Sequence, residues 1–224
     1  MKAIVPPPPP PGTPPPKFPP LPTHTDLPDK DHGYQKDYRY VPAPDHTQLP
    51  DKDGTFVRNS HEPLQSHLLT ETIRPVLRQL SPEGNYFIGE DCGIYWRLTE
   101  PLERGVKAPD WYCVLGVPHL LNGQMRRSYV MWQEVIPPLL LLEYTADEGV
   151  EERDRTPLEG KMWVYETAIR APYYGILEVN RARLEFFELH HMRYEPMAPN
   201  ERGHYPIPSL GVELGIWQGS FGGY

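Results

Sequence analysis

Short apolar runs separated by turn residues make up most of the chain beyond residue 85, and their lengths predict strands. Residues 86–89, 93–98 and 111–115 are rich in aromatic and β-branched side chains, which favour pleated structure. A continuous run of leucines at residues 139–142 leads into Glu143, which is typical of a strand buried on both faces. The remaining predicted strands are residues 173–179, 184–189, 193–197 and 212–217, of which the second and third form a hairpin.

Two stretches carry apolar residues at helical spacing. The first covers residues 64–80, with Ser60 as a suitable N-cap. Pro75 lies inside this pattern and should kink or split the helix, because it lacks an amide proton and its ring clashes with the preceding turn. The second stretch, residues 158–169, has an apolar stripe formed by Leu158, Met162, Tyr165 and Ile169. The order helix, strands, helix, strands predicts a mixed α/β (α+β) sheet domain.

Proline separates the front of the chain from this domain. The 224 residues include 30 prolines, and residues 6–11 are all proline. Because proline blocks helices and sheet ladders, residues 1–48 are predicted to be a disordered proline-rich tail and linker. A solvated tail is the simpler interpretation, but Pro-x-x-Pro spacing also suits a protein partner with an SH3- or WW-like groove. The domain proper is expected at residues 49–218, followed by a C-terminal tail at residues 219–224.

The net charge limits the kind of nucleic-acid contact that is expected, and the cysteines indicate the redox compartment. The net charge is −8 with a pI near 5.6, so any contact with a nucleic-acid backbone should be local and salt-sensitive. Cys92 and Cys113 show no motif spacing and are expected to be thiols in a reducing compartment. No run reaches the ~18 apolar residues of a membrane span, and no signal peptide is evident. A cytoplasmic location without membrane contact is therefore expected.

The candidate chemistry lies in two acids at strand ends. Asp110 comes directly before the strand at 111–115, and Glu143 ends the leucine-rich run. Carboxylates seldom occupy such places unless they are paired or bind a metal. If the two strands are neighbours, both acids meet at one edge of the sheet and could hold a divalent cation through oxygen.

Two other patterns suit metal binding less well. Residues 51–62 begin like a calcium loop, but Phe56 stands where the sharp turn needs glycine. His190 and His191 are adjacent, so on a strand they would point to opposite faces, and no Cys or His lies at ligand spacing from them. We expect a turn at the first pattern and structural histidines at the second.

A set of segments in shared order carries a family resemblance. They are residues 89–97, 108–111, 126–130, 139–143, 160–166 and 210–215. Together they resemble the bacterial Uma-two family of restriction-endonuclease-like proteins in the PD-(D/E)xK nuclease superfamily. The resemblance covers roughly residues 49–218. It implies a central mixed sheet flanked by helices, with a C-terminal antiparallel hairpin, and an endonuclease that cuts nucleic acid with Mg²⁺ or Mn²⁺.

The resemblance also implies roles for individual residues. Asp110 matches the first acid of the motif and Glu143 the second, and the Tyr144 carbonyl would complete the metal ligands. Thr145 stands where the standard motif has a lysine, and Lys161 on the following helix fits the family's displaced basic residue. An acid from another element often completes such sites, and the candidates are Glu62, Glu71 and Asp91.

The function expected from the resemblance is a hydrolase that cleaves phosphodiester bonds, with DNA as the substrate. A catalytically silent nuclease fold used for binding or assembly is the alternative, favoured by the acidic net charge and by Thr145. An adaptor that works through its proline-rich tail is a second alternative. The sequence leaves open DNA against RNA, the cleavage site and a homodimer.

Overall fold

The computed structural model describes residues 43–49, 61–146 and 148–219. The chain divides into two compact units, Met1–Val41 and Pro42–Tyr224, and every described residue belongs to the second. The predicted proline-rich tail before residue 43, the Ser60 cap and the last residues lie outside the described part.

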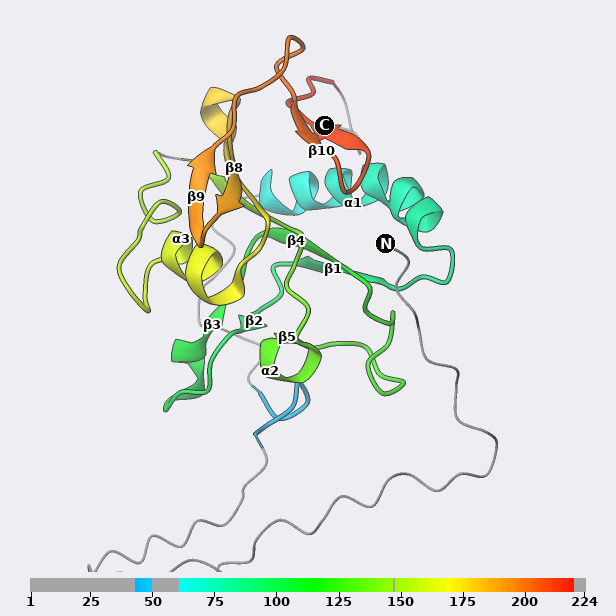
Figure 1. The fold of residues 1–224 in the computed structure, drawn as a ribbon, viewed down its shortest axis with the longest axis vertical. Helices are drawn as coiled ribbons and strands as arrows, with labels where there is room; N and C mark the ends of the chain where they lie inside the picture. Colours follow the sequence, from blue (N-terminus) through cyan, green and yellow to red (C-terminus); the bar gives the residue numbers. More distant parts are fainter. Residues whose placement is uncertain (1–42, 50–60, 147, 220–224) are drawn as a thin grey trace, which may run out of the picture. The chain divides into compact units, whose positions relative to one another are not determined.

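A six-stranded mixed sheet forms the centre of the described unit, in the order β1-β4-β6-β7-β8-β9. Its strands β1, β4, β8 and β9 are labelled in Figure 1. Strands β6 and β7 pair in parallel, and the other neighbours pair antiparallel. The predicted mixed α/β fold is therefore confirmed. The bounds are β1 Tyr86–Glu90, β4 Trp111–Leu115, β6 Leu140–Thr145, β7 Tyr173–Glu178, β8 Arg183–His190 and β9 Arg193–Pro196.

Two smaller sheets flank the central one. A three-stranded sheet has the order β3-β2-β5, with bounds β2 Ile94–Tyr95, β3 Val106–Lys107 and β5 Tyr129–Val130. The predicted hairpin at 184–197 is formed by β8 and β9, and strands β10 (Tyr205–Ile207) and β11 (Val212–Leu214) add a further antiparallel pair near the C-terminal end of the described residues. The strand predicted at 93–98 is reduced to β2, because the chain turns away after Trp96 into the short 3₁₀ helix η2 (Leu102–Gly105).

Helix α1 (His61–Leu80) covers one face of the sheet and runs through Pro75 as a single element, so the predicted split does not occur. Pro75 lies on the exposed side, where water can satisfy the carbonyl left without an amide partner. The apolar pattern places Leu77 and Ile73 correctly in the core, while Leu80 is half exposed and the inner side also includes the polar Ser66 and Thr70. Among the described residues, no helix combines the length and apolar character needed to cross a membrane.

The second helix differs from its prediction at its start. Leu158 is about half exposed and has a positive φ of 67°, so it belongs to a turn. The helix begins as α3 (Lys161–Trp163) and continues as the π-helix η3 (Val164–Ile169). Met162, Tyr165 and Ile169 are buried as predicted. A π-helix is wider than an α-helix and recurs at functional sites, so this segment is a candidate part of such a site.

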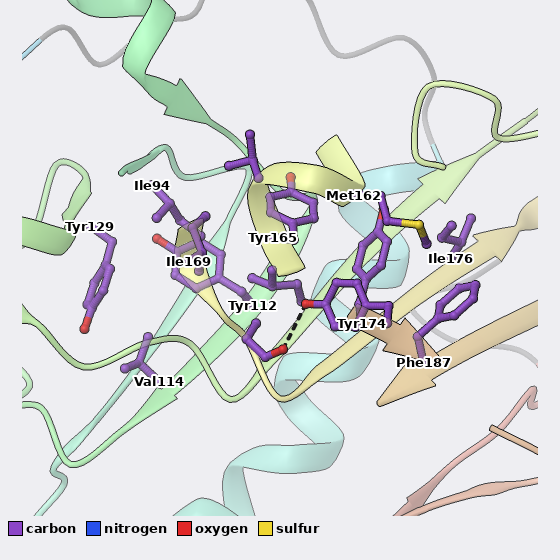
Figure 2. Packing of buried hydrophobic residues seen from close by; sticks show 14 of the residues in the cluster. Ile94, Tyr112, Val114, Tyr129, Met162, Tyr165, Ile169, Tyr174, Ile176 and Phe187 are labelled. Carbon is purple, nitrogen blue, oxygen red and sulfur yellow. Dashed lines mark hydrogen bonds between the residues drawn. The ribbon is translucent and has the colours of Figure 1, made fainter. Parts of the chain in front are cut away.

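Strand alternation divides the core into two clusters. Leu140, Leu142 and Tyr144 on β6 belong to the cluster beneath α1, which also receives residues from β10 and β11. Leu141 belongs to the opposite cluster, beneath α3 and η3, which is rich in tyrosine (Figure 2). Because successive side chains on a strand alternate, Glu143 points to the same side as Leu141. The strand thus delivers Glu143 beneath the π-helix.

Residues 43–49 pack against the part of the unit around β5. Leu49 is buried with Tyr95 and Val130. The indole nitrogen of Trp132 donates a hydrogen bond to the Pro44 carbonyl at 3.1 Å. Ordered contacts of the described unit thus include residues before position 49.

Gly175, in the middle of β7, offers a test of the packing between strands. A Cβ at this position would lie 2.5 Å from Leu142 Cδ2 and 3.0 Å from Phe186 Cδ2. Gly175→Ala is therefore expected to destabilise the fold by about 1–3 kcal/mol, measured by urea unfolding.

Leu142→Ala provides the control through a double-mutant cycle. If the cost arises from the clash, the double variant should be more stable than the sum of the two single effects predicts. Additive effects, or a Gly175→Ala midpoint equal to wild type, would show that the strands do not meet in this way.

Candidate active site

The register of the central sheet brings the two predicted acids together. Strands β4 and β6 are antiparallel with Trp111 opposite Leu142, so Asp110 lies opposite Glu143. Opposed residues of an antiparallel pair point to the same face. Asp110 Oδ2 accepts a hydrogen bond from the Tyr144 amide at 2.5 Å. The two acids therefore lie at one edge of the sheet, on the side of α3 and η3.

Glu143 is buried, and both of its carboxylate oxygens have partners. The Tyr165 hydroxyl donates to Oε1 at 2.6 Å, and Lys161 Nζ donates to Oε2 at 3.0 Å. Burial raises the pKa of Glu143, although the charge of Lys161 and the hydrogen bond from Tyr165 oppose that rise. These two donors fix the orientation of the carboxylate.

Lys161 bridges two acids at the start of α3. Its ammonium lies 3.0 Å from Glu143 Oε2 and 3.3 Å from Glu152 Oε1. Burial acts to lower the pKa of Lys161, but the charges of Glu143 and Glu152 outweigh it and raise the pKa above its ordinary value. The structure thus places the ammonium of Lys161 beside Glu143, where two acids favour its charged form.

Asp110 lies partly buried beside a second acid. Burial raises its pKa to about 8, and the nearby charge of Glu143 adds to the rise. The Tyr144 amide and Lys161 lower it in part, whereas Glu62 raises it further. An excess of negative charge at low dielectric is the condition in which a bound cation gains most.

The other three acids proposed for this site differ in where their side chains lie relative to Asp110. Glu62, in the first turn of α1, is close enough for its charge to raise the pKa of Asp110. Glu71 lies on the exposed side of α1 and pairs with Arg74 at 2.6 Å. The Asp91 side chain is exposed, and its backbone amide bonds to the Asp110 carbonyl at 3.1 Å. Of the three candidates, Glu62 is thus a charge that acts on Asp110.

Polar residues on α1 attach this helix to the start of β4. The Ser66 hydroxyl donates to the Asp110 carbonyl at 3.1 Å, and Thr70 accepts the indole N–H of Trp111 at 2.9 Å. Both contacts are partly or fully buried, where an unmade hydrogen bond would be costly. They fix the start of β4, and with it the position of Asp110. No pattern in the sequence had predicted these two contacts.

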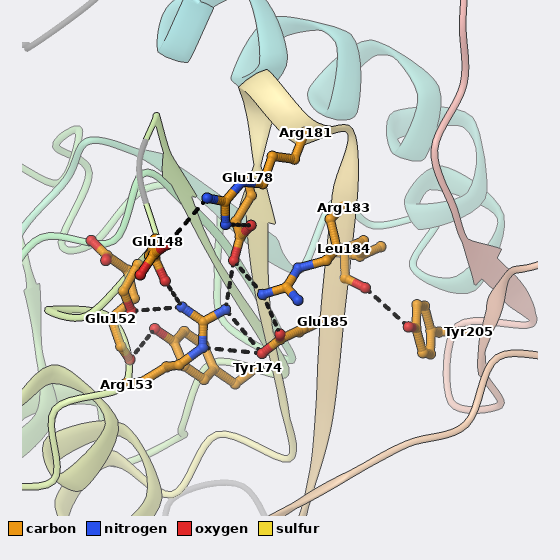
Figure 3. A network of polar contacts seen from close by, with 11 residues as sticks. Glu148, Glu152, Arg153, Tyr174, Glu178, Arg181, Arg183, Leu184, Glu185 and Tyr205 are labelled. Carbon is orange, nitrogen blue, oxygen red and sulfur yellow. Dashed lines mark hydrogen bonds and ion pairs between the residues drawn. The ribbon is translucent and has the colours of Figure 1, made fainter.

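A cluster of arginines and glutamates holds the loop that carries Glu152 (Figure 3). Arg153 pairs with Glu178 and with Glu185, both at 3.0 Å. The Tyr174 hydroxyl donates to the Glu152 carbonyl at 2.9 Å. The loop is thus attached to β7 and β8, which fixes Glu152 next to Lys161. No prediction from the sequence had assigned a role to this loop.

The histidine pair has a structural setting. His190 ends β8 with Nε2 3.1 Å from Glu188 Oε2, and His191 follows in the turn with a φ of 49°. Nowhere in the described ranges do three or more His, Cys, Asp or Glu side chains form a group that could hold a metal. A metal at the sheet edge would therefore rest on two carboxylates and a backbone oxygen. Asp110, Glu143 and the Tyr144 carbonyl fit a hard divalent cation by the chemistry of their oxygens.

A mixed sheet with two acids and a lysine at one edge is the arrangement expected of a restriction-endonuclease-like protein. The family model Uma2, described as "Putative restriction endonuclease", matches residues 38–220. The chain belongs to this family. The family assignment establishes the nuclease-like class of the protein.

Comparison with solved structures found a similar protein from Anabaena variabilis ATCC 29413, described as a "putative nuclease belonging to DUF820". The match covers 72% of this chain and 80% of the other, with 12% sequence identity and a TM-score of 0.43. The comparison with curated proteins found no match.

The raised pKa of Asp110 predicts a gain in stability when its charge is removed. The folded-state pKa of about 8 exceeds the ordinary 3.8, so ionisation of Asp110 lowers stability as the pH rises through this range. Asp110→Asn keeps an oxygen that can accept the Tyr144 amide. In EDTA at about pH 9 it should therefore melt several degrees above wild type, and the gain should vanish near about pH 4.

Glu71→Gln is the control, because it removes a charge from an exposed pair on α1. It should change the melting temperature little at either pH. A variant Asp110→Asn that melts below wild type at about pH 9 would contradict the electrostatic assignment.

Proposed function

We propose that this chain is a divalent-metal-dependent nuclease that hydrolyses phosphodiester bonds, with DNA as its substrate. The observation that carries the proposal is the opposition of Asp110 and Glu143 across β4 and β6, with Lys161 at 3.0 Å from Glu143. Membership of a family described as "Putative restriction endonuclease" supports both the reaction and the choice of DNA.

Asp110 and Glu143 would hold Mg²⁺ or Mn²⁺, together with the backbone carbonyl of Tyr144. When bound, such an ion makes a water more acidic and neutralises charge on the phosphate under attack. Asp110 supplies the oxygen not engaged by the Tyr144 amide. Tyr165 keeps the Glu143 carboxylate in one orientation through its 2.6 Å hydrogen bond.

Lys161 would stabilise the negative charge that develops on the phosphate, or orient the attacking water. It is placed for this role by two acids on different elements, Glu143 on β6 and Glu152 on the preceding loop. If Glu143 turns an oxygen toward an ion, Glu152 still holds the ammonium at the sheet edge. Glu152 is thus a positioning residue in this proposal.

A catalytically silent nuclease fold that only binds is the second candidate. Thr145 occupies the usual place of the motif lysine, and Lys161 is already neutralised by two carboxylates. In addition, no group of three or more metal-binding side chains is present among the described residues, so an ion at this site would have only two carboxylate ligands. These observations favour a binding module if the site fails to cleave.

Plasmid cleavage with Mg²⁺ or Mn²⁺ separates the two candidates. Wild type should nick or cut the plasmid, and Glu143→Gln should abolish cleavage because it replaces a charged metal ligand by a neutral amide. Glu71→Gln, which removes an equal charge from the exposed side of α1, should cleave like wild type. Cleavage retained by Glu143→Gln, or absent from wild type with both metals, would sink the nuclease proposal.

Lys161 has a separate test. Lys161→Ala should bind Mn²⁺ but lose cleavage by about 10²–10³-fold, the usual cost of losing one charge-stabilising donor. Lys161→Arg should recover only part of the loss, because a planar guanidinium does not replace a compact ammonium. Metal binding is followed by the rise in melting temperature with Mn²⁺. Equal cleavage by Lys161→Ala and wild type would remove Lys161 from the mechanism.

A further inference from the structure

A second lysine, Lys107, approaches the same edge of the sheet from a different element. It ends β3 and lies opposite Ile94 on β2. Asp110 follows three residues later, so the two Cα atoms are at most ~11 Å apart even in extended chain. Lys107 therefore lies beside the entrance to β4, where Asp110 is presented.

The three-stranded sheet that carries Lys107 is packed against the helix that carries Lys161. Trp96, directly after β2, meets Trp163 of α3 edge to face, with ring centroids 6.3 Å apart. Ile94 and Trp96 both pack in the cluster beneath α3 and η3, and Lys107 shares the face of its partner Ile94. The fold thus directs Lys107 and Lys161 toward the same side of the two acids.

The two lysines differ in their partners. Lys161 lies within 3.3 Å of two carboxylates. Within the part of the chain that the structure describes, the Lys107 ammonium has no carboxylate within the 4.0 Å limit of an ion pair and donates no hydrogen bond. Burial lowers the pKa of Lys107, and the charge of Lys161 adds to that effect against the opposing charges of Glu151, Glu143 and Asp154. Lys107 is thus a partly buried cation whose donors are unused.

We propose that Lys107 binds a non-bridging oxygen of a backbone phosphate of the nucleic-acid substrate, next to the Asp110–Glu143 edge. This proposal rests on the proposed function, because it assigns part of the substrate to a residue of the same site. An ammonium with unused donors and a cationic neighbour is suited to a phosphate, which accepts several charge-assisted hydrogen bonds. In a chain with a net charge of −8, such a contact is local.

The two lysines have different roles in this proposal, because they differ in their carboxylate partners. Lys161 is held by Glu143 and Glu152, so it acts at a fixed place on the phosphate under attack. Lys107 is available to any phosphate that reaches the edge, so it contributes to binding before reaction. Loss of Lys107 should therefore raise KM and weaken DNA binding, while kcat changes less.

Fluorescence anisotropy with a labelled DNA duplex in EDTA tests the contact without cleavage. Lys107→Met keeps the apolar stem of the side chain and removes the charge. It should bind more weakly, and the slope of log affinity against log salt should fall by about 0.9, the contribution of one phosphate contact. Between about 50 and 200 mM salt, the ratio of wild-type to variant affinity should shrink about threefold.

Two variants control for charge and for folding. Lys107→Arg should restore the salt slope, since it can contact a phosphate. Arg78→Ala removes one positive charge near the end of α1, 16 residues and ~24 Å of helix from Glu62, and should leave the slope unchanged. A Lys107→Met curve that coincides with that of Arg78→Ala, or no duplex binding by wild type at low salt, would overturn the proposal.

The outcomes also distinguish this proposal from the proposed function. If wild type binds with a slope that depends on Lys107 but never cleaves, the phosphate contact stands and the nuclease mechanism fails. If wild type cleaves and Lys107→Met matches it in KM and salt slope, the mechanism stands and the phosphate contact fails.

Discussion

The burial of the Glu143 carboxylate is the constraint on which the site depends. Moving such a group out of water costs several kcal/mol unless it is paired and hydrogen-bonded. Lys161 supplies the charge and Tyr165 the second hydrogen bond, and both come from the short helix that covers this face. The same contacts thus hold α3 and η3 against the sheet and orient Glu143 at the edge of the sheet.

Two acids with the same sequence setting show how the environment decides their role. Glu143 lies near the end of β6 and Glu178 at the end of β7, and both are buried. Hydrogen bonds from Arg183 and Arg153 lower the pKa of Glu178, whereas burial raises the pKa of Glu143. Glu178 is satisfied within the protein and serves to hold a loop. Glu143, beside Asp110 with its raised pKa, is the acid that a cation would stabilise.

Sequence patterns predicted the parts of the fold that follow from local periodicity. Strand β4 was predicted with its observed bounds. The predicted end of β7 lies one residue beyond the observed end. Short elements such as β3 and β10 were not predicted, since their few residues are held by partners distant in the chain. The helix start was placed at Leu158 because apolar spacing does not reveal a positive φ.

The same limits apply to the candidate site. Asp110 and Glu143 could be selected because acids at the ends of apolar strands are unusual, and the family resemblance added Lys161. Glu152 and Lys107 were not selected, because their places depend on how a loop and a small sheet pack against α3. Such contacts between distant segments leave no periodic signal in the sequence.

The packing around Thr145 gives a physical reason for a lysine on the helix instead of the strand. Thr145 lies opposite Glu178 in the parallel register of β6 and β7, so it borders the cluster of Arg153, Arg181 and Arg183. The same loop approaches it closely, since a Cβ on Gly149 would lie 3.2 Å from Thr145 Cγ2. A lysine at position 145 would add a positive charge and a long side chain to this filled space. Lys161 reaches Glu143 from α3, where Glu152 can share it, and this route allows one sheet edge to hold both the arginine cluster and the candidate site.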